Sequence, residues 1–470
     1  MSLFKTRYNN KRILFVATMT LSLTVATLSV NADSSSEPAV EQHTTPAGHT
    51  LWYYPMPQAE RTALAISWQQ QVPVKDMHPS TARLAIDLML NGGAGDRDAA
   101  QIVADYQDLD AGSGLWADAR EVSGFIVAPN EHLSKAREIA HQVLAEPALG
   151  ERWFEREHQE LLEAVSEERS STWGLAGTLL RQALLKDHPY NNFWSDGPID
   201  KIESISLDHV KAWHKSSFST ASTTVVAAGS ADPDVIAKEL DLLFAKLPKT
   251  KPVEPIDFPK PTVPGKTVLL HKPDAPKTAV IVLGSFPSHS QDNDIPLQLG
   301  VGVLGLGQHS RLFKTVRAGL GASYGFGAEV FNFTQEHRFL EMAGEIETDK
   351  LSEALDEIEQ AYSEFQKDGI GRVEFPLAKR FFKREVEKQL NNPVAMAFSV
   401  NESVKKGFST DYAYTLLDHI DSLKRDKVNN LISTSFPRYD QLLKIIVSSD
   451  KNALSNACVI ENLEEMENCF

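Results

Sequence analysis

Two hydrogen-bond donors, Arg317 and Tyr324, stand seven positions apart in the second half of the chain. They belong to the segment Ser310-Arg-Leu-Phe-Lys-Thr-Val-Arg-Ala-Gly-Leu-Gly-Ala-Ser-Tyr, which predicts a short helix, a glycine turn and the start of a strand. Arginine keeps its charge at any working pH, and a phenol can donate a hydrogen bond. Donors brought together by such a turn could stabilise an oxyanion or bind a peptide carbonyl. They could equally be a surface arginine at a helix end and a tyrosine packed in a sheet.

The segment resembles the second-domain signature of the pitrilysin/insulinase-like zinc peptidases. In that signature an S-R-L-F run precedes an Arg and a Tyr that are seven positions apart, and here 324 − 317 = 7. The resemblance extends from about Thr45 to about Leu454. It implies that Arg317 and Tyr324 bind the substrate carbonyl or stabilise the oxyanion.

The resemblance also implies a zinc motif in the first half, H-x-x-E-H on a helix, with a glutamate about 75 residues later. Arg83 stands at the first histidine, Ile86 at the general base and Asp87 at the second histidine. Glu163 matches the third ligand, since 163 − 87 = 76. Arginine cannot ligate a cation and isoleucine cannot take a proton from water. We therefore expect no metal in this chain and no peptide hydrolysis by the chain alone.

A charge could replace the missing metal. Arg83 and Asp87 are four residues apart on one helix and can pair, and Arg83 could also reach Glu163. A competing hypothesis is a stand-alone hydrolase that holds another metal through Asp87 and Glu163, but Arg83 in the same pocket opposes it. The histidines are scattered and show no ligand spacing.

The resemblance implies a function in a complex. One subunit of some two-chain members carries H-x-x-E-H, and a similar partner lacks it and supplies the Arg/Tyr pair. We therefore expect a non-catalytic subunit of an exported heteromeric zinc endopeptidase that acts on unfolded peptides. The zinc would be in a catalytic partner of similar size. The alternative is a catalytically dead peptide-binding or scaffold protein of the same fold.

The apolar patterns predict an α+β protein built from two similar halves, each a mostly antiparallel sheet packed by helices. Strand-like and helical patterns of the first half recur in the second. The corresponding ranges are 62–68 and 278–283, 133–144 and 351–365, 151–165 and 371–390, and 223–228 and 442–447. Two similar halves that face each other would form a cleft at their interface.

A proline-rich stretch at 247–266 separates these halves. Its six prolines oppose both helix and sheet, which predicts an interdomain linker. The first peptidase-like domain is then 44–246 and the second, with the Arg/Tyr pair, 267–454. A C-terminal tail, 455–470, contains the only two cysteines, Cys458 and Cys469, which we expect to form a disulfide.

The N-terminus predicts export, with the bacterial periplasm as the destination. A basic start, an apolar run from Ile13 to about Val30 and a V-x-A site indicate a signal peptide at 1–32, followed by a flexible leader at 33–43. The run could instead be an uncleaved anchor, but no later stretch suggests a membrane span. Cleavage would remove four cations and no anions, taking the net charge from −16 to −20. Such a charge argues against nucleic acid or an anionic membrane as partner.

Overall fold

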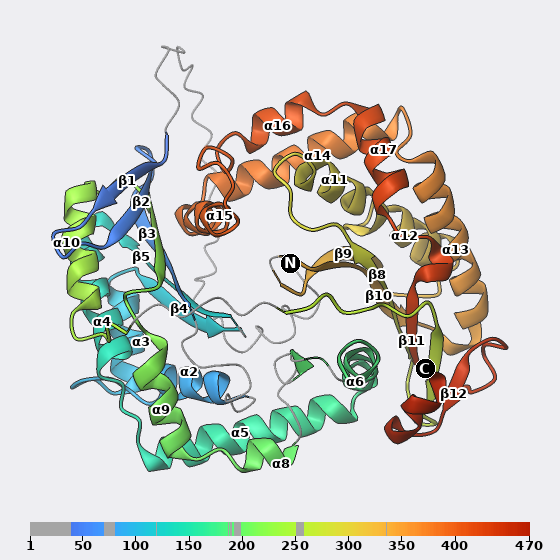
Figure 1. Ribbon diagram of the computed structural model, residues 1–470, viewed down its shortest axis with the longest axis horizontal. Helices are drawn as coiled ribbons and strands as arrows, with labels where there is room; N and C mark the ends of the chain where they lie inside the picture. The colour runs from blue at the N-terminus through green and yellow to red at the C-terminus, as the bar shows by residue number, and fades with distance from the viewer. Residues whose placement is uncertain are drawn as a thin grey trace.

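The computed structural model describes residues 39–69, 80–118, 120–186, 188, 190–191, 199–250, 258–334 and 336–470. It contains two six-stranded sheets, one in each half of the chain, each packed by helices (Figure 1). The prediction of two similar α+β halves is confirmed. The predicted signal peptide and residues 33–38 of the leader lie outside the described residues.

The first sheet has the strand order β1-β2-β6-β3-β5-β4 and is antiparallel except for the pair β2–β6. Strands β3 and β6 are nearly continuous buried runs, as expected for strands covered on both faces, and they lie at the centre of this sheet. The strand bounds are Glu41–Thr44 for β1, Thr50–Pro55 for β2, Arg61–Gln69 for β3, Gly112–Ala117 for β4, Glu121–Pro129 for β5 and Thr223–Gly229 for β6.

The second sheet repeats this plan with the order β12-β7-β11-β8-β10-β9, in which β7 pairs in parallel with β11 and β12. Strand β9 forms one edge of this sheet and pairs only with β10. The bounds are Thr267–His271 for β7, Thr278–Phe286 for β8, Phe326–Asn332 for β9, Arg338–Ile346 for β10, Leu443–Ser448 for β11 and Cys458–Ile460 for β12.

Two predicted boundaries need correction. The leader predicted to be flexible through His43 is too long, because β1 begins at Glu41 and pairs with β2. The C-terminal segment is also more than a tail, since β12 adds to the second sheet beside β7. Its cysteines, Cys458 and Cys469, form a disulfide with their Cα atoms 5.7 Å apart.

Apart from α6 and α15, the helices of each half pack on the same side of its sheet and build the main cores. In the first half they are α2 (Thr81–Asn91), α3 (Ala99–Asp108), α4 (Leu133–Ala145), α5 (Glu151–Ser170), α6 (Thr172–Leu185), α8 (Ile199–Glu203), α9 (Leu207–Ser217) and α10 (Pro233–Phe244). In the second they are α11 (Asp294–Gly305), α12 (Arg311–Phe313), α13 (Leu351–Asp368), α14 (Glu374–Leu390), α15 (Pro393–Lys405), α16 (Leu416–Ser422) and α17 (Arg425–Ser435). None of the helices in the described ranges combines the length and apolarity that crossing a membrane requires.

The other face of each sheet is covered by a helix from the opposite half. Helix α6 packs on β8 and β11 of the second sheet, whereas α15 packs on β3 and β6 of the first (Figure 1). The two halves are therefore joined by reciprocal helix exchange as well as by the linker.

A buried amide fixes the position of α15. Asn401 is fully buried, and its side chain accepts a hydrogen bond from Ser67 Oγ at 3.0 Å and donates one to the Thr224 carbonyl at 3.1 Å. Four residues later, Lys405 pairs with Glu121 at 2.6 Å. Because buried polar groups are costly without partners, these contacts fix one register of α15 on the first sheet.

Candidate functional site

The structure brings Arg317 and Tyr324 together. Arg317 lies in the π-helical segment Lys314–Gly319 that continues α12, and its guanidinium donates a hydrogen bond to the Tyr324 carbonyl. Arg317 Cζ is 4.7 Å from the centroid of the Tyr324 ring and 5.3 Å from that of Phe313. These distances are typical of cation–π contacts, so the arginine holds the tyrosine ring from one side.

The Tyr324 side chain faces solvent. It is 79% exposed, and its hydroxyl has no hydrogen-bond partner among the described residues. Strand β9 begins at Phe326, two residues after Tyr324, so the tyrosine precedes the strand that it was expected to open. A phenol and a guanidinium are thus presented side by side at the start of an edge strand.

Buried neighbours make this turn rigid. Val316 and Ala322 are buried in the core of the second half, and Ala322 N donates to the Val316 carbonyl at 2.9 Å. Gly321 between them has φ +58°, a conformation that favours glycine. Lys350 Nζ also donates to the Leu320 carbonyl at 2.8 Å. The backbone of the turn is therefore held by packing and hydrogen bonds, and the Tyr324 ring rests on Arg317.

Helix α2 carries the residues that correspond to the missing zinc motif. Ile86 and Asp87 are buried and Arg83 is half-buried. Gly92 caps the C-terminal end of this helix, and Gly93 follows it at φ +90°. A metal that needs histidine ligands and a general base does not fit these side chains, because Ile86 is apolar and Arg83 brings a positive charge. In the part of the chain that the structure describes, no three His, Cys, Asp or Glu side chains are grouped to hold a metal.

Glu163 lies on the exposed side of α5, where its carboxylate accepts a hydrogen bond from Gln159 Nε2 at 2.8 Å. The buried stripe of α5 consists of Phe154, Glu157, Leu161 and Val165. Because two residues turn a helix by more than half a circle, Glu163 points away from this stripe. The pairing of Arg83 with Asp87 or Glu163 stays a prediction.

Glu157 of α5 contacts α2 through its carboxyl group, and the sequence pattern was not used to predict this. Glu157 Oε2 accepts a hydrogen bond from Asn91 Nδ2 at 3.2 Å. Burial raises the pKa of Glu157, the Asn91 hydrogen bond lowers it and the nearby Asp87 charge raises it again. Its helical spacing from Phe154 and Leu161 was the signal that could have placed it on the buried face.

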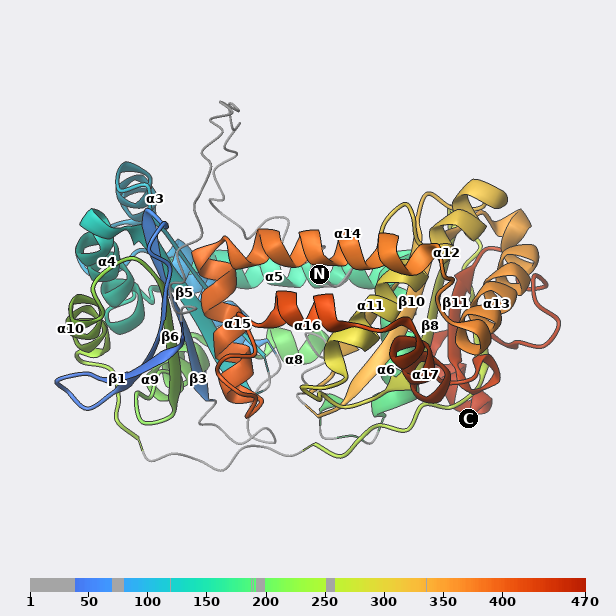
Figure 2. The same ribbon diagram turned by 90° about the horizontal axis from the view of Figure 1, so that it is seen from above.

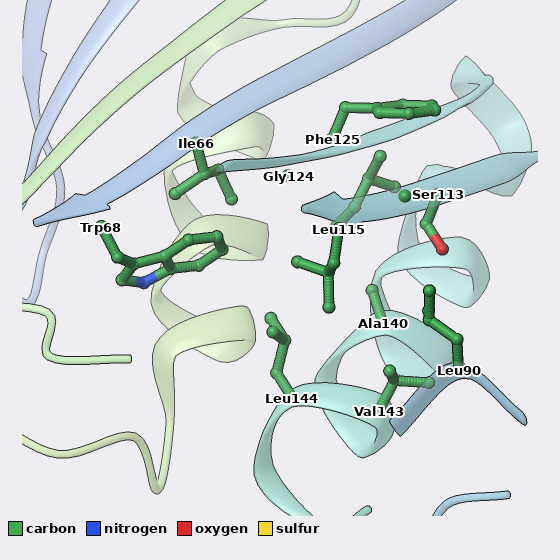
Figure 3. Close-up of a pocket in the computed structure, with 12 residues that line it drawn as sticks. Ile66, Trp68, Leu90, Ser113, Leu115, Gly124, Phe125, Ala140, Val143 and Leu144 are labelled. Atoms are coloured by element: carbon green, nitrogen blue, oxygen red, sulfur yellow. The ribbon is translucent and has the colours of Figure 1, made fainter. Parts of the chain in front are cut away.

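The cavity beside the first sheet is apolar and small. It lies between the sheet and α4, and Ile66, Leu115 and Leu144 point into it (Figure 3). Its volume of about 20 Å³ has room for about one water molecule. This space is a packing gap and is too small for a peptide.

Comparisons with known proteins find similarity to peptidase-family sequences. Residues 204–382 match the family model described as "Peptidase M16 inactive domain". An uncharacterized zinc protease of Rickettsia felis is 19% identical over 396 residues, which cover 83% of this chain and 93% of that protein.

Solved structures show the same fold. The peptidase M16 inactive domain from Pseudomonas fluorescens superposes with a TM-score of 0.72 at 19% identity, covering 90% of this chain and 99% of that one. The periplasmic protease PqqL from Escherichia coli gives a TM-score of 0.70 at 11% identity, covering 92% of this chain but 49% of that one. The whole of this two-sheet structure is thus similar to about half of the longer protease.

Proposed function

We propose that the chain is a non-catalytic member of the M16 peptidase family and the Arg/Tyr-bearing subunit of an exported two-chain zinc endopeptidase. The observation that carries the proposal is the adjacent, exposed pair of Arg317 and Tyr324 in a chain whose α2 lacks the histidines and the general base of the zinc motif. A second chain of similar size would supply H-x-x-E-H and zinc. The similarity of this chain to about half of a longer protease supports such a division of labour.

In this proposal the two donors act on the carbonyl of a bound peptide. The Tyr324 hydroxyl donates a hydrogen bond to the carbonyl oxygen, and the charge of Arg317 beside the ring favours negative charge on that oxygen. Because the backbone of the turn is fixed by Val316 and Ala322, the two donors stay close to each other when the peptide binds.

The substrate would be an unfolded peptide that adds as a strand to an open sheet edge. Strand β9 is such an edge, and it starts two residues after Tyr324. A peptide paired with β9 would therefore pass close to Tyr324, with main-chain hydrogen bonds providing affinity.

Export is supported by the signal-like N-terminus and the Cys458–Cys469 disulfide, which persists in an oxidising compartment. The similarity to a periplasmic protease of Escherichia coli is consistent with the same location.

Co-purification from the native envelope fraction tests the proposal. We expect a partner chain with an intact H-x-x-E-H motif, cleavage of a quenched peptide by the pair, loss of cleavage with a chelator, and no cleavage by this chain alone. If the chain elutes alone and inert, the proposal is wrong and the peptide-binding or scaffold alternative replaces it.

A further inference from the structure

One face of α14 is exposed and apolar although the helix is part of a folded core. Val373, just before the helix, is 80% exposed, Leu377 is 57% exposed and Phe381 is 47% exposed. Their spacing of four residues puts the three side chains in one line along the helix surface. Helix α14 crosses between the two halves of the molecule (Figures 1 and 2).

Cations flank this apolar line. At 3.6 residues per turn, the exposed Arg372, Arg380, Arg384 and Lys388 fall on the same half of the helix circumference as the apolar residues. We call these seven residues the α14 stripe. Lys388 pairs with Glu385 at 2.6 Å, but within the described ranges the three arginines make no ion pair.

The remaining charges of α14 leave the arginines available. Glu374 pairs with Arg311 at 2.7 Å, and Lys383 pairs with Asp421. Glu387 is a half-buried carboxylate on the same half of the helix as the stripe, and no ion pair of its own is found among the described residues. The opposite side of the helix packs on the second core through Phe375 and Phe382, so the stripe is held on a rigid support.

The charge of the α14 stripe is opposite to that of the chain as a whole, which is −16. The related helix of the first half, α5, shows the contrast, because its exposed side is rich in carboxylates. These are Glu151, Glu155, Glu160, Glu163, Glu167 and Glu168. A net-negative protein repels acidic chains over most of its surface, so a basic, apolar stripe selects where such a chain can bind.

From these observations we infer that the α14 stripe binds an acidic amphipathic segment of another polypeptide, with apolar residues at helical spacing and carboxylates beside them. The apolar side chains of the segment pack on Val373, Leu377 and Phe381, and its carboxylates pair with the arginines, which can bind them in a bidentate manner. The stripe spans about 22 Å, enough for about four turns of a bound helix. This inference does not depend on a catalytic partner.

Fluorescence anisotropy with a defined probe tests the inference. The probe is a labelled synthetic peptide of about 18 residues, with Leu and Phe at i, i+4 and i+8 and Glu beside them. The control peptide has every Glu replaced by Lys. We expect the full-length chain to bind the acidic peptide, to bind it more weakly as salt is raised, and not to bind the basic peptide.

Variants of the chain separate the charge contribution from the apolar one. We expect Arg380→Glu/Arg384→Glu and Leu377→Ser/Phe381→Ser each to weaken binding about tenfold or more. The matched control is Lys211→Glu/Lys215→Glu on the exposed side of α9, which makes the same change in net charge and should leave binding unchanged. Thermal unfolding of all variants verifies that they are folded.

Three results would overturn the inference. The acidic peptide fails to bind the wild-type chain, the control reversal on α9 weakens binding as much as the reversal on α14, or the apolar variant binds like wild type. Vesicles of phosphatidylserine and phosphatidylcholine form a separate arm. Binding to these vesicles through the stripe without binding to the peptide would assign the stripe to a membrane surface and would also overturn the inference.

Discussion

A buried carboxyl group in the second sheet should make the stability of the protein depend on pH. Glu341 lies in β10, is 2% exposed and stands opposite Glu329 of the edge strand β9. Its neighbours on the same face of the strand, Phe339 and Ala343, belong to the core under α6. Burial, with a smaller contribution from the charge of Glu329, raises the pKa of Glu341 from 4.5 to about 8.

The sign of the effect follows from which state holds the proton. Below pH 4.5 the Glu341 carboxyl is neutral in both the folded and the unfolded chain, so its contribution to folding is most favourable there. Between pH 4.5 and about 8 only the unfolded chain releases the proton, and each pH unit destabilises the folded state by about 1.4 kcal/mol. The loss over this whole interval is up to about 5 kcal/mol.

Glu341→Gln removes the ionisation and keeps the shape of the side chain. We expect its unfolding free energy in denaturant to exceed that of the wild type by an amount that grows by about 3 kcal/mol between about pH 5.5 and about pH 8. With Glu341 retained, Glu329→Gln should make the unfolding free energy depend less on pH, because it removes the neighbouring charge that helps to raise the pKa of Glu341. A difference between Glu341→Gln and wild type that is the same at both pH values would refute the burial argument.

Three further predictions concern other parts of the molecule. In the reconstituted two-chain enzyme, Tyr324→Phe should lower the rate of peptide cleavage about a hundredfold without preventing assembly, and an unchanged rate would remove Tyr324 from the mechanism. Asn401→Ala leaves buried hydrogen-bond partners unsatisfied and should lower the free energy of unfolding in denaturant by about 1–3 kcal/mol. Asn430→Ala, on an exposed helix surface, should lower it much less, and equal losses would contradict the anchoring role of Asn401. Replacing Cys458 and Cys469 by serine should lower stability by about 2–3 kcal/mol, and wild type under reducing conditions should match the variant.

Local patterns were sufficient to predict much of the fold. The apolar periodicity located β3 and β8 and the stripes of α4 and α13. The proximity of Arg317 and Tyr324 was also predictable, because only a helix end and a glycine turn separate the two residues. These features depend on interactions between residues close in the sequence.

The errors and omissions concern long-range contacts. Strand β1 is polar, and it becomes a strand because β2 offers its edge. Glu163 was assigned from family spacing alone, because which side of α5 is buried depends on how that helix packs on α2. The exchange of α6 and α15 leaves no mark in a sequence pattern, since an apolar helix face has the same spacing whichever sheet it covers.

The reciprocal helix exchange has a consequence for the order in which the chain can mature. The last strand of the first sheet ends at Gly229, and the helix that covers its second face begins at Pro393, 393 − 229 = 164 residues later. During synthesis from the N-terminus, Tyr54, Ala65 and Val226 must stay uncovered until most of the chain has emerged. A nascent or truncated first half therefore exposes apolar surface and is prone to aggregation and proteolysis. Only chains synthesised through the end of α15 can cover this surface.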